Sequence, residues 1–186
     1  MKKLLLAAIA AASMIPAVAS AQETTTDGSR PFGIDPYVGV MGGYEGFESD
    51  PGHGIPYSKP GNRLKGGLVE GVAGVNVPLG SFFVGAEGNV AKGFTGDIDW
   101  EYGVHGRVGA RAGETGLIYV KAGYQWVDTK EKGKNDNWAY GLGVEVGPKD
   151  IGLGGLTGNS GARLRLEATT YDFHSIRPMA GVVFHL

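Results

Sequence analysis

Residues 162–168 read ARLRLEA, a stretch in which charged and apolar side chains alternate strictly. Arginine and glutamate occupy the odd-numbered positions, while leucine and alanine occupy the even-numbered ones. Successive side chains of a β-strand point to opposite faces, so a strand here has one ionic face and one apolar face. The stretch therefore predicts a β-strand that separates two very different environments.

The same period of two recurs along the chain in stretches separated by clusters of Gly, Pro, Asp and Asn. Such clusters mark turns, and the alternation between them is typical of strands. The strands predicted from this pattern cover residues 37–47, 65–77, 82–94, 98–111, 116–127, 137–147, 162–172 and 178–186. Because they are even in number and follow one another through turns, we expect an all-β, eight-stranded, antiparallel up-and-down β-barrel.

One face of these predicted strands carries nearly all of their charges. The charged residues on this face are Glu45, Glu70, Glu87, Asp99, Glu101, Arg107, Arg111, Lys121, Glu145, Arg163, Arg165 and Glu167. The opposite face is apolar or aromatic, and its two lysines, Lys65 and Lys92, fall near strand ends. A soluble barrel turns its apolar face inward, whereas a transmembrane barrel turns it toward lipid. Alternation alone does not choose between these two arrangements.

Composition excludes several classes of protein. The 186 residues suit one domain, and 34 glycines without a three-residue period exclude collagen. The absence of cysteine excludes disulfides, thiolate zinc sites and cysteine nucleophiles, and the four histidines show no zinc-ligand spacing. We therefore expect no metal and no cofactor. The formal net charge is −2, and a negatively charged protein repels the phosphate backbone, so we expect no nucleic-acid partner.

The N-terminus predicts export. Lys2 and Lys3 precede an apolar stretch that ends near Pro16, and residues 19–21 form a small-residue cleavage signature. We interpret residues 1–21 as a signal peptide, 22–34 as a periplasmic N-terminal segment and 35–186 as the barrel. No later run of 18 apolar residues predicts a transmembrane helix.

The aromatic residues of the apolar face fall at two levels. If the first strand starts in the periplasm, an outer aromatic girdle is expected to contain Tyr44, Trp100, Tyr102, Tyr124, Trp126, Trp138 and Tyr140. An inner level is expected to contain Tyr37, Phe82, Phe83 and Phe184. Amphipathic rings favour the headgroup depth of a bilayer, so two such levels indicate that the apolar face contacts lipid.

The chain ends on Gly181, two free positions, Phe184, His185 and Leu186. This resembles the terminal signal that outer-membrane barrels present to their assembly machinery, although Met179 stands where a polar residue is usual and Leu replaces the usual Phe. With the export signal and the eight strands, the chain resembles the small eight-stranded outer-membrane β-barrels, the opacity-protein and OmpA/OmpX-like porin family. The resemblance implies the outer membrane, surface exposure, and the barrel assembly machinery and lipopolysaccharide as partners.

The interior of an eight-stranded barrel is just wide enough for side chains to fill it. Ionic groups there must pair, so we expect a plug in which acids and bases interleave. The residues expected in this network are Glu70, Glu87, Glu101, Arg107, Arg111, Lys121, Glu145, Arg163, Arg165 and Glu167. The predicted function is a structural or adhesin-like surface role for a monomer; the alternatives are a low-conductance pore and a soluble periplasmic ligand-binding barrel.

Two further features bear on function. Segments 48–64 and 128–136 are polar and are expected to be the first and third external loops, where surface ligands bind. His174 and Ser175 are adjacent near Asp172, whereas outer-membrane lipid A deacylases place their histidine and serine two positions apart on one strand face. Adjacent side chains point apart, so we expect no catalytic residues and no enzyme.

Overall fold

The computed structural model describes residues 34–48, 63–113, 115–130, 133–147 and 161–186. They form the strands β1 (Asp35–Phe47), β2 (Lys65–Leu79), β3 (Phe82–Gly93), β4 (Ile98–Ala112), β5 (Gly116–Thr129), β6 (Gly133–Val146), β7 (Ala162–Tyr171) and β8 (Ser175–His185). Among these residues no helix is long and apolar enough to cross a membrane. The predicted signal peptide, residues 22–33 of the predicted periplasmic segment, and residues 148–160, which connect β6 to β7, lie outside the described residues.

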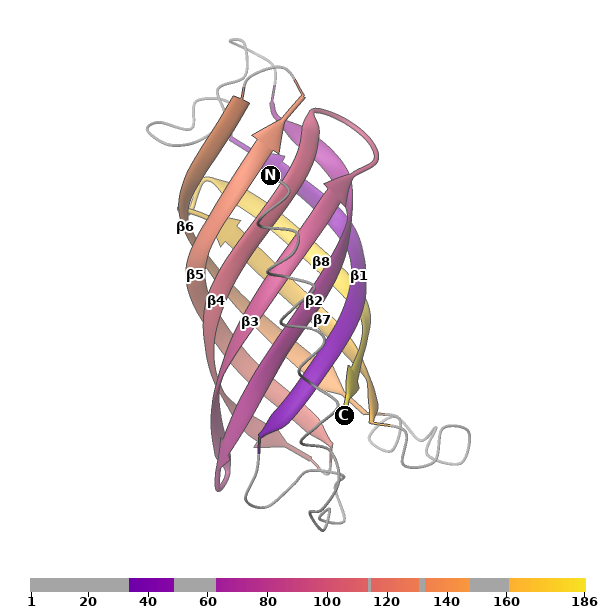
Figure 1. Ribbon diagram of the computed structural model, residues 1–186, viewed down its shortest axis with the longest axis vertical. Coiled ribbons are helices and arrows are strands. Elements are labelled where there is room, and N and C mark those ends of the chain that lie inside the picture. Colours follow the sequence, from indigo (N-terminus) through magenta and orange to yellow (C-terminus); the bar gives the residue numbers. More distant parts are fainter. Residues whose placement is uncertain (1–33, 49–62, 114, 131–132, 148–160) are drawn as a thin grey trace, which may run out of the picture.

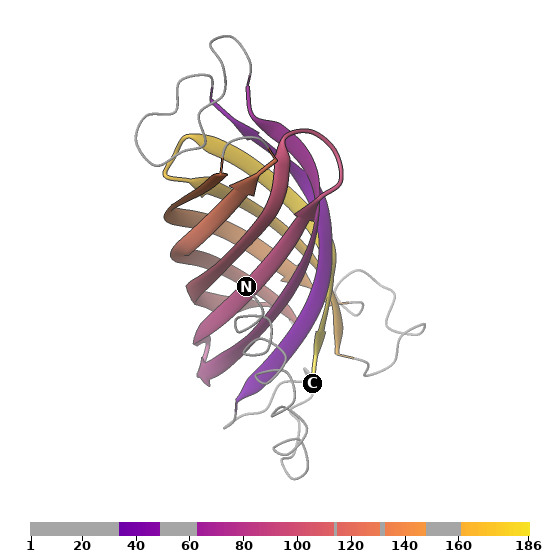
Figure 2. The same cartoon turned by 45° about the horizontal axis from the view of Figure 1, so that its top comes forward.

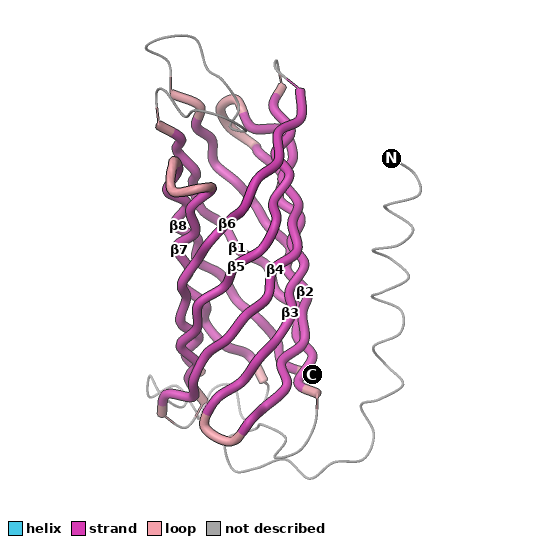
Figure 3. The backbone as a smooth tube through the Cα atoms, turned by 90° about the vertical axis from the view of Figure 1, so that its left-hand side faces the viewer, coloured by secondary structure: helices cyan, strands magenta, loops and turns pink. Residues whose placement is uncertain are grey.

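The eight strands close into a barrel. Each strand pairs antiparallel with the next, and β8 returns to pair with β1. The strands are strongly tilted and wind around a common axis (Figures 1, 2 and 3). Closure leaves the described sheet without an edge, so its backbone donors and acceptors are satisfied between strands. The predicted fold class is confirmed. The inner end denotes the end at which β1 begins and β8 ends, and the outer end denotes the opposite one.

β1 begins at Asp35, two residues before the predicted start, and two further strands, β6 and β8, begin earlier by more than that. β6 begins at Gly133 rather than at 137, because the register with β5 continues through Asp128↔Lys134 and Thr129↔Gly133. The segment 128–136, predicted as a loop, is therefore largely strand; polar residues at a strand end resemble a loop in sequence. β8 begins at Ser175 rather than at 178, which brings Arg177 into the sheet. Within the predicted loop 48–64, residues 49–62 lie outside the described residues.

The two faces of the sheet differ sharply in exposure. On the outer wall, Val40 is 63% exposed and Leu142 is 61% exposed. In the interior, Glu101 and Arg165 are both 0% exposed. This distribution is the reverse of that in a soluble barrel, whose apolar side chains face inward.

Three predicted positions are wrong. Asp99 does not enter the barrel, because the register shifts between Ile98 and Trp100, and it pairs instead with the exposed Lys92. A bulge of this kind re-aims the side chains beyond it, so Ile98 is buried. Tyr37 and Phe83 do not belong to an outward inner level, because both are buried inside the barrel. They lie on the same strand parity as the interior charges, which the aromatic pattern obscures.

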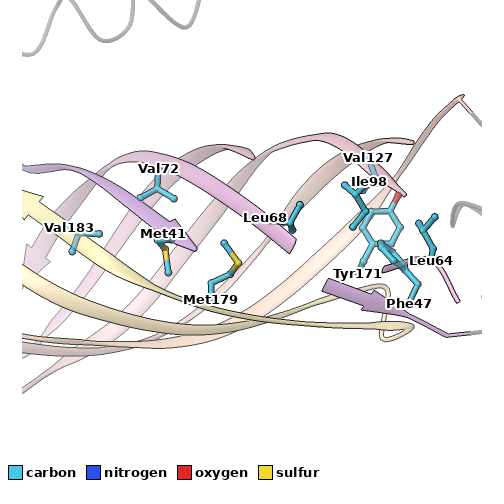
Figure 4. Close-up of a cluster of buried hydrophobic side chains, with 10 residues drawn as sticks. All are labelled: Met41, Phe47, Leu64, Leu68, Val72, Ile98, Val127, Tyr171, Met179 and Val183. Atoms are coloured by element: carbon cyan, nitrogen blue, oxygen red, sulfur yellow. The ribbon is translucent and has the colours of Figure 1, made fainter. Parts of the chain in front are cut away.

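Apolar side chains occupy the outer end of the interior. Phe47, Leu64, Ile98, Val127 and Tyr171 gather there, in what we call the apolar cap (Figure 4). The ring centroids of Phe47 and Tyr171 are 5.8 Å apart in an edge-on arrangement. The cap separates the ionic interior from the outer end of the barrel.

Glycine makes room for the large interior rings. Tyr119 lies opposite Gly143 on β6, and a Cβ atom at Gly143 would overlap its ring. Tyr37 lies opposite Gly74 on β2 in the same way, with Cζ 2.5 Å from the position of such a Cβ. The abundance of glycine therefore has a packing role in this narrow barrel.

Gly181 lies at the seam where β8 meets β1. It pairs with Met41, and a Cβ atom there would lie 2.6 Å from the Cα of Met41 and would overlap the carbonyl oxygen of Val40. Both obstacles are backbone, so neither yields by a change of rotamer. The seam requires glycine at this position.

We expect Gly181→Ala to lower the free energy of unfolding by about 1–3 kcal/mol, the usual cost of overpacking. Gly71→Ala is the matched control, because the nearest atom to a Cβ there is the Val90 carbonyl oxygen at 4.0 Å. Urea unfolding in detergent micelles measures both changes. Equal stability of the two variants would contradict the role assigned to Gly181.

Candidate functional site

Ionic side chains lie in the barrel interior in two clusters. The inner cluster comprises Glu87, Arg107, Lys121, Glu145, Arg165 and Glu167. The outer cluster, nearer the apolar cap, comprises Glu45, Glu70, Glu101 and Arg177. Every one of these residues is at most 5% exposed. Alternation along the strands places them inside, and closure of the sheet brings residues distant in sequence into contact.

Glu87 on β3 is the centre of the inner cluster. Its Oε2 contacts Arg165 Nη1, lies 3.3 Å from Arg107 Nη1 and accepts a hydrogen bond of 2.7 Å from the Tyr37 hydroxyl. Its Oε1 lies 3.2 Å from Lys121 Nζ. One carboxylate therefore joins strands β1, β3, β4, β5 and β7, which no local sequence signal predicts.

Glu145 on β6 completes the contacts of the two arginines. Its Oε1 accepts hydrogen bonds from Arg107 Nη2 at 2.8 Å and from Arg165 Nε and Nη2 at 3.1 and 2.8 Å. Its Oε2 lies 2.8 Å from His185 Nε2, and His185 Nδ1 lies 2.9 Å from Asp35. Charge-assisted contacts of this kind are among the strongest hydrogen bonds in proteins.

Two tyrosines order the cations of the inner cluster. The Tyr119 hydroxyl donates to Glu167 at 2.6 Å, and Glu167 also pairs with Lys121. The guanidinium carbon of Arg107 lies 3.8 Å from the centroid of the Tyr119 ring and 4.9 Å from that of Tyr37. Both rings therefore lie within cation–π distance of Arg107, which adds cation–π attraction to the ion pairs.

The inner cluster is balanced in charge. Its three carboxylates face three cations, and each carboxylate contacts at least one cation. Removing one partner of a buried ion pair leaves an uncompensated charge, so the members hold one another in place. Together with the aromatic rings they occupy the interior at this level.

The outer cluster is arranged around a single cation. Arg177 Nη2 contacts Glu70, Nη1 lies 3.2 Å from Glu101, and Nε lies 3.9 Å from Glu45. Neutral donors add to these contacts. Asn89 Nδ2 donates to Glu70 at 2.8 Å, and Ser175 Oγ donates to Glu45 at 2.8 Å.

The structure brings most of the predicted network residues together, but in two clusters rather than one. The predicted residues that form interior ion pairs are Glu70, Glu87, Glu101, Arg107, Lys121, Glu145, Arg165 and Glu167. Arg163 is buried and acts electrostatically on Asp35, outside both clusters. Arg111 is only half-buried, near the end of β4.

Sequence reasoning missed several important members. Arg177 lies between the predicted strands 162–172 and 178–186, and Pro178 is typical of the first residue of a strand. The period of two, extended backward from Val183 through Met179, places Arg177 on the interior face. The same parity places His185 and Tyr37 inside, and it was the signal that could have found them.

Outward aromatic side chains form a series of ring contacts across β4, β5 and β6, which we call the aromatic ladder, and one separate pair. Tyr102 and Trp126 stack with centroids 5.5 Å apart, and Tyr124 contacts Trp126 and Trp138 edge-on at 5.2 and 6.0 Å. Tyr140 stacks on Phe173 at 4.9 Å.

The remaining girdle residues stand apart from the ladder. Tyr44 is exposed on β1, and Trp100 on β4 lies under the ammonium group of Lys92, 4.6 Å from the ring centroid. Trp100 and Tyr102 lie near the outer end of β4, whereas Tyr140 lies at the middle of β6.

Ser175 and His174 have separate partners. Ser175 Oγ bonds to Glu45, as described above, whereas His174 Nδ1 lies 3.2 Å from Glu48 Oε2 at the surface. The two side chains do not form a nucleophile–base pair. Among the described residues no group of three or more His, Cys, Asp or Glu residues is arranged to hold a metal ion.

The terminal signal residues lie at the seam. Phe184 and Leu186 point outward, and the Leu186 amide donates to the Pro36 carbonyl oxygen at 2.9 Å. Gly181 allows β8 to approach β1, as described above. The last residues of the chain thus close the barrel against its first strand.

No protein-family model matches the chain, and no curated protein matches it. Among solved structures, a β-barrel from work on the de novo design of transmembrane β-barrels is 15% identical with a TM-score of 0.48, over 82% of this chain and 95% of that one. Neisserial surface protein A (NspA) is 13% identical with a TM-score of 0.48, over 83% and 99%. Ail, the attachment invasion locus protein of Yersinia pestis, solved with the heparin analogue sucrose octasulfate, is 12% identical with a TM-score of 0.38, over 81% and 98%.

We expect Glu87→Ala to lower the free energy of unfolding by about 3–5 kcal/mol, because it leaves buried cations without their carboxylate. Asp99→Ala is the matched control. It breaks the exposed ion pair with Lys92 and should cost no more than about 1 kcal/mol. Chemical unfolding in micelles, followed by tryptophan fluorescence, measures both values; a small effect of Glu87→Ala would show that the ion pairs are dispensable.

Proposed function

We propose that the protein is an outer-membrane β-barrel with a closed interior, and that its role is structural or lies in surface interactions. The observation that carries this proposal is the inversion of the two faces. Apolar side chains cover the outer wall while charged side chains are buried within the barrel. Water disfavours this arrangement, because the wall would expose a continuous apolar surface to the solvent.

The chemistry of a bilayer supports the proposed location. Lipid offers no hydrogen-bond partners, so a spanning sheet must close on itself, as the pairing of β8 with β1 does. A charge on the lipid side at mid-bilayer costs about 2–4 kcal/mol. The exposed ion pair Lys92–Asp99 lies at the outer-end level of Trp100, where charged groups reach the headgroups.

The filled interior supports a plug rather than a pore. The inner cluster spans the barrel through Glu87, Arg107, Glu145 and Arg165, each with a side chain 0% exposed. A solute would have to separate these pairs or pass between them. Partners can contact a barrel with a closed interior only at its surface, so we place the function at the wall and at the outer end.

Partners follow from these surfaces. The aromatic ladder, with Lys134 Nζ 6.0 Å from the Tyr102 ring centroid, suits the headgroup region of lipopolysaccharide and other outer-membrane lipids. The ending with Gly181, Phe184 and Leu186 suits recognition by the barrel assembly machinery. No surface ligand is assigned, and we propose a monomer, because the barrel closes within one chain.

We expect the tryptophans to report the orientation of the wall. The chain has three, Trp100, Trp126 and Trp138, and all belong to the outward face near the outer end. In lipid vesicles, lipids brominated near the headgroup should quench their fluorescence more than lipids brominated at the chain ends. Protein that stayed monodisperse in buffer, with no quenching in vesicles, would support the soluble alternative.

We expect the purified protein to give no steady conductance in planar lipid bilayers, because the inner cluster closes the barrel. Heat-modifiable gel mobility of the same preparation should verify that the barrel is folded. Large, steady conductance from folded protein would replace the plug with a pore.

A further inference from the structure

The outer cluster carries more negative than positive charge. Three carboxylates, Glu45, Glu70 and Glu101, face one guanidinium, that of Arg177. If all three were ionised, two negative charges would lack a partner, whereas the inner cluster is balanced. A buried ion without a partner is strongly unfavourable, so the excess negative charge of the cluster must be neutralised.

The groups around the excess charge supply no further cation. The neighbouring strands contribute Asn89 from β3, Gln125 from β5, Tyr171 from β7 and Ser175 from β8, all neutral. His105, a buried imidazole of β4, lies at the level below, and the apolar cap lies above. Within the part of the chain that the structure describes, Arg177 is the cation in direct contact with the cluster.

Two carboxylate oxygens of this cluster have no donor. Glu45 Oε2 and Glu101 Oε1 are fully buried and receive no hydrogen bond, although their residues are only 3% and 0% exposed. The two carboxyl groups contact the same guanidinium, with Glu101 3.2 Å from Arg177 Nη1 and Glu45 3.9 Å from Arg177 Nε. A hydrogen bond between the two carboxyl groups would satisfy both oxygens. Two ionised carboxylates have no proton with which to form such a bond, whereas a carboxylic acid and a carboxylate form a strong one.

We infer that Glu45 and Glu101 form a proton-binding pair inside the barrel, in which one carboxylic acid donates its hydroxyl to the other carboxylate. The proton removes one of the two excess charges. The charge that remains on the pair is stabilised by the hydrogen bond that Ser175 Oγ donates to Glu45 at 2.8 Å and by Arg177 Nη1, 3.2 Å from Glu101. The inference holds whichever solvent surrounds the barrel wall, because it concerns only the interior.

The pair makes the outer half of the barrel sensitive to pH. At neutral pH the folded barrel retains a proton that the unfolded chain releases, so folding takes up one proton. Stability contributed by this site is therefore greatest at acid pH and falls as pH rises. Alkaline pH should ionise the pair and loosen the outer half before the balanced inner cluster.

The test compares Glu101→Gln with the wild type in urea unfolding in micelles from pH 5 to pH 9. Glutamine mimics a protonated glutamate, so the two proteins should be alike near pH 5. As pH rises, the ratio of the wild-type unfolding constant to that of the variant should increase by up to about tenfold per pH unit, the slope of one proton. Other titrating groups, His105 included, are common to both proteins, so their effects on the two unfolding constants cancel in the ratio.

Glu70→Gln is the matched control in the same cluster. Glu70 contacts Arg177 and accepts from Asn89, so its replacement should lower the unfolding midpoint at every pH in the range. If Glu101→Gln behaves as Glu70→Gln does, with no change in the ratio across pH, Glu101 is ionised and the inference is overturned. Glu45→Gln should behave as Glu101→Gln does.

Infrared spectroscopy of the wild type detects a protonated carboxylic acid directly and needs no variant that folds. A carbonyl band of a protonated carboxylic acid should be present at pH 7 and shift in D₂O; its absence would overturn the proton-binding pair.

Unfolding in calcium chloride and in EDTA tests whether a metal ion neutralises the cluster instead. If calcium raises the wild-type midpoint and EDTA lowers it, with no effect on Glu101→Gln, a metal ion rather than a proton neutralises the cluster.

Discussion

Closure of the sheet is the constraint on which the rest of the structure depends. Once β8 pairs with β1, every second side chain of every strand enters a narrow interior, and its neighbours along the strand face outward. Each side chain at a strand centre therefore faces either the interior or the outside. The segregation of ions from apolar groups is therefore set by strand parity, and each interior ion must find its partner among the side chains of other strands.

The interior meets this requirement differently at its two levels. In the inner cluster, two tyrosines and three pairs of opposite charges satisfy one another, with Glu87 linking five strands. In the outer cluster, one arginine serves three carboxylates beneath the apolar cap. The first arrangement gives rigidity across the pH range in which the carboxylates stay ionised. The second makes the barrel's outer half depend on where a proton resides.

The alternation of side chains along the strands determines both the wall and the interior. Glycines on the interior parity make room for Tyr37 and Tyr119, which in turn stack on the guanidinium groups. On the outward parity, the opposite, outer half of the barrel carries the aromatic ladder, with Lys134 beside Tyr102. A barrel built this way has ion pairs in its interior and apolar and aromatic side chains on its wall.

The sequence by itself determined the strands, their antiparallel order and which parity carries charge, because a period of two is a local property that survives any register. It also placed the girdle residues on one face. It failed where a local irregularity changes parity, as at Asp99, and where Pro178 concealed the start of β8 and with it Arg177. Only the tertiary structure decided which acid meets which base, because the pairing depends on the stagger between strands and on closure at the seam. The division into a balanced and an unbalanced cluster follows from that stagger, which no single strand encodes.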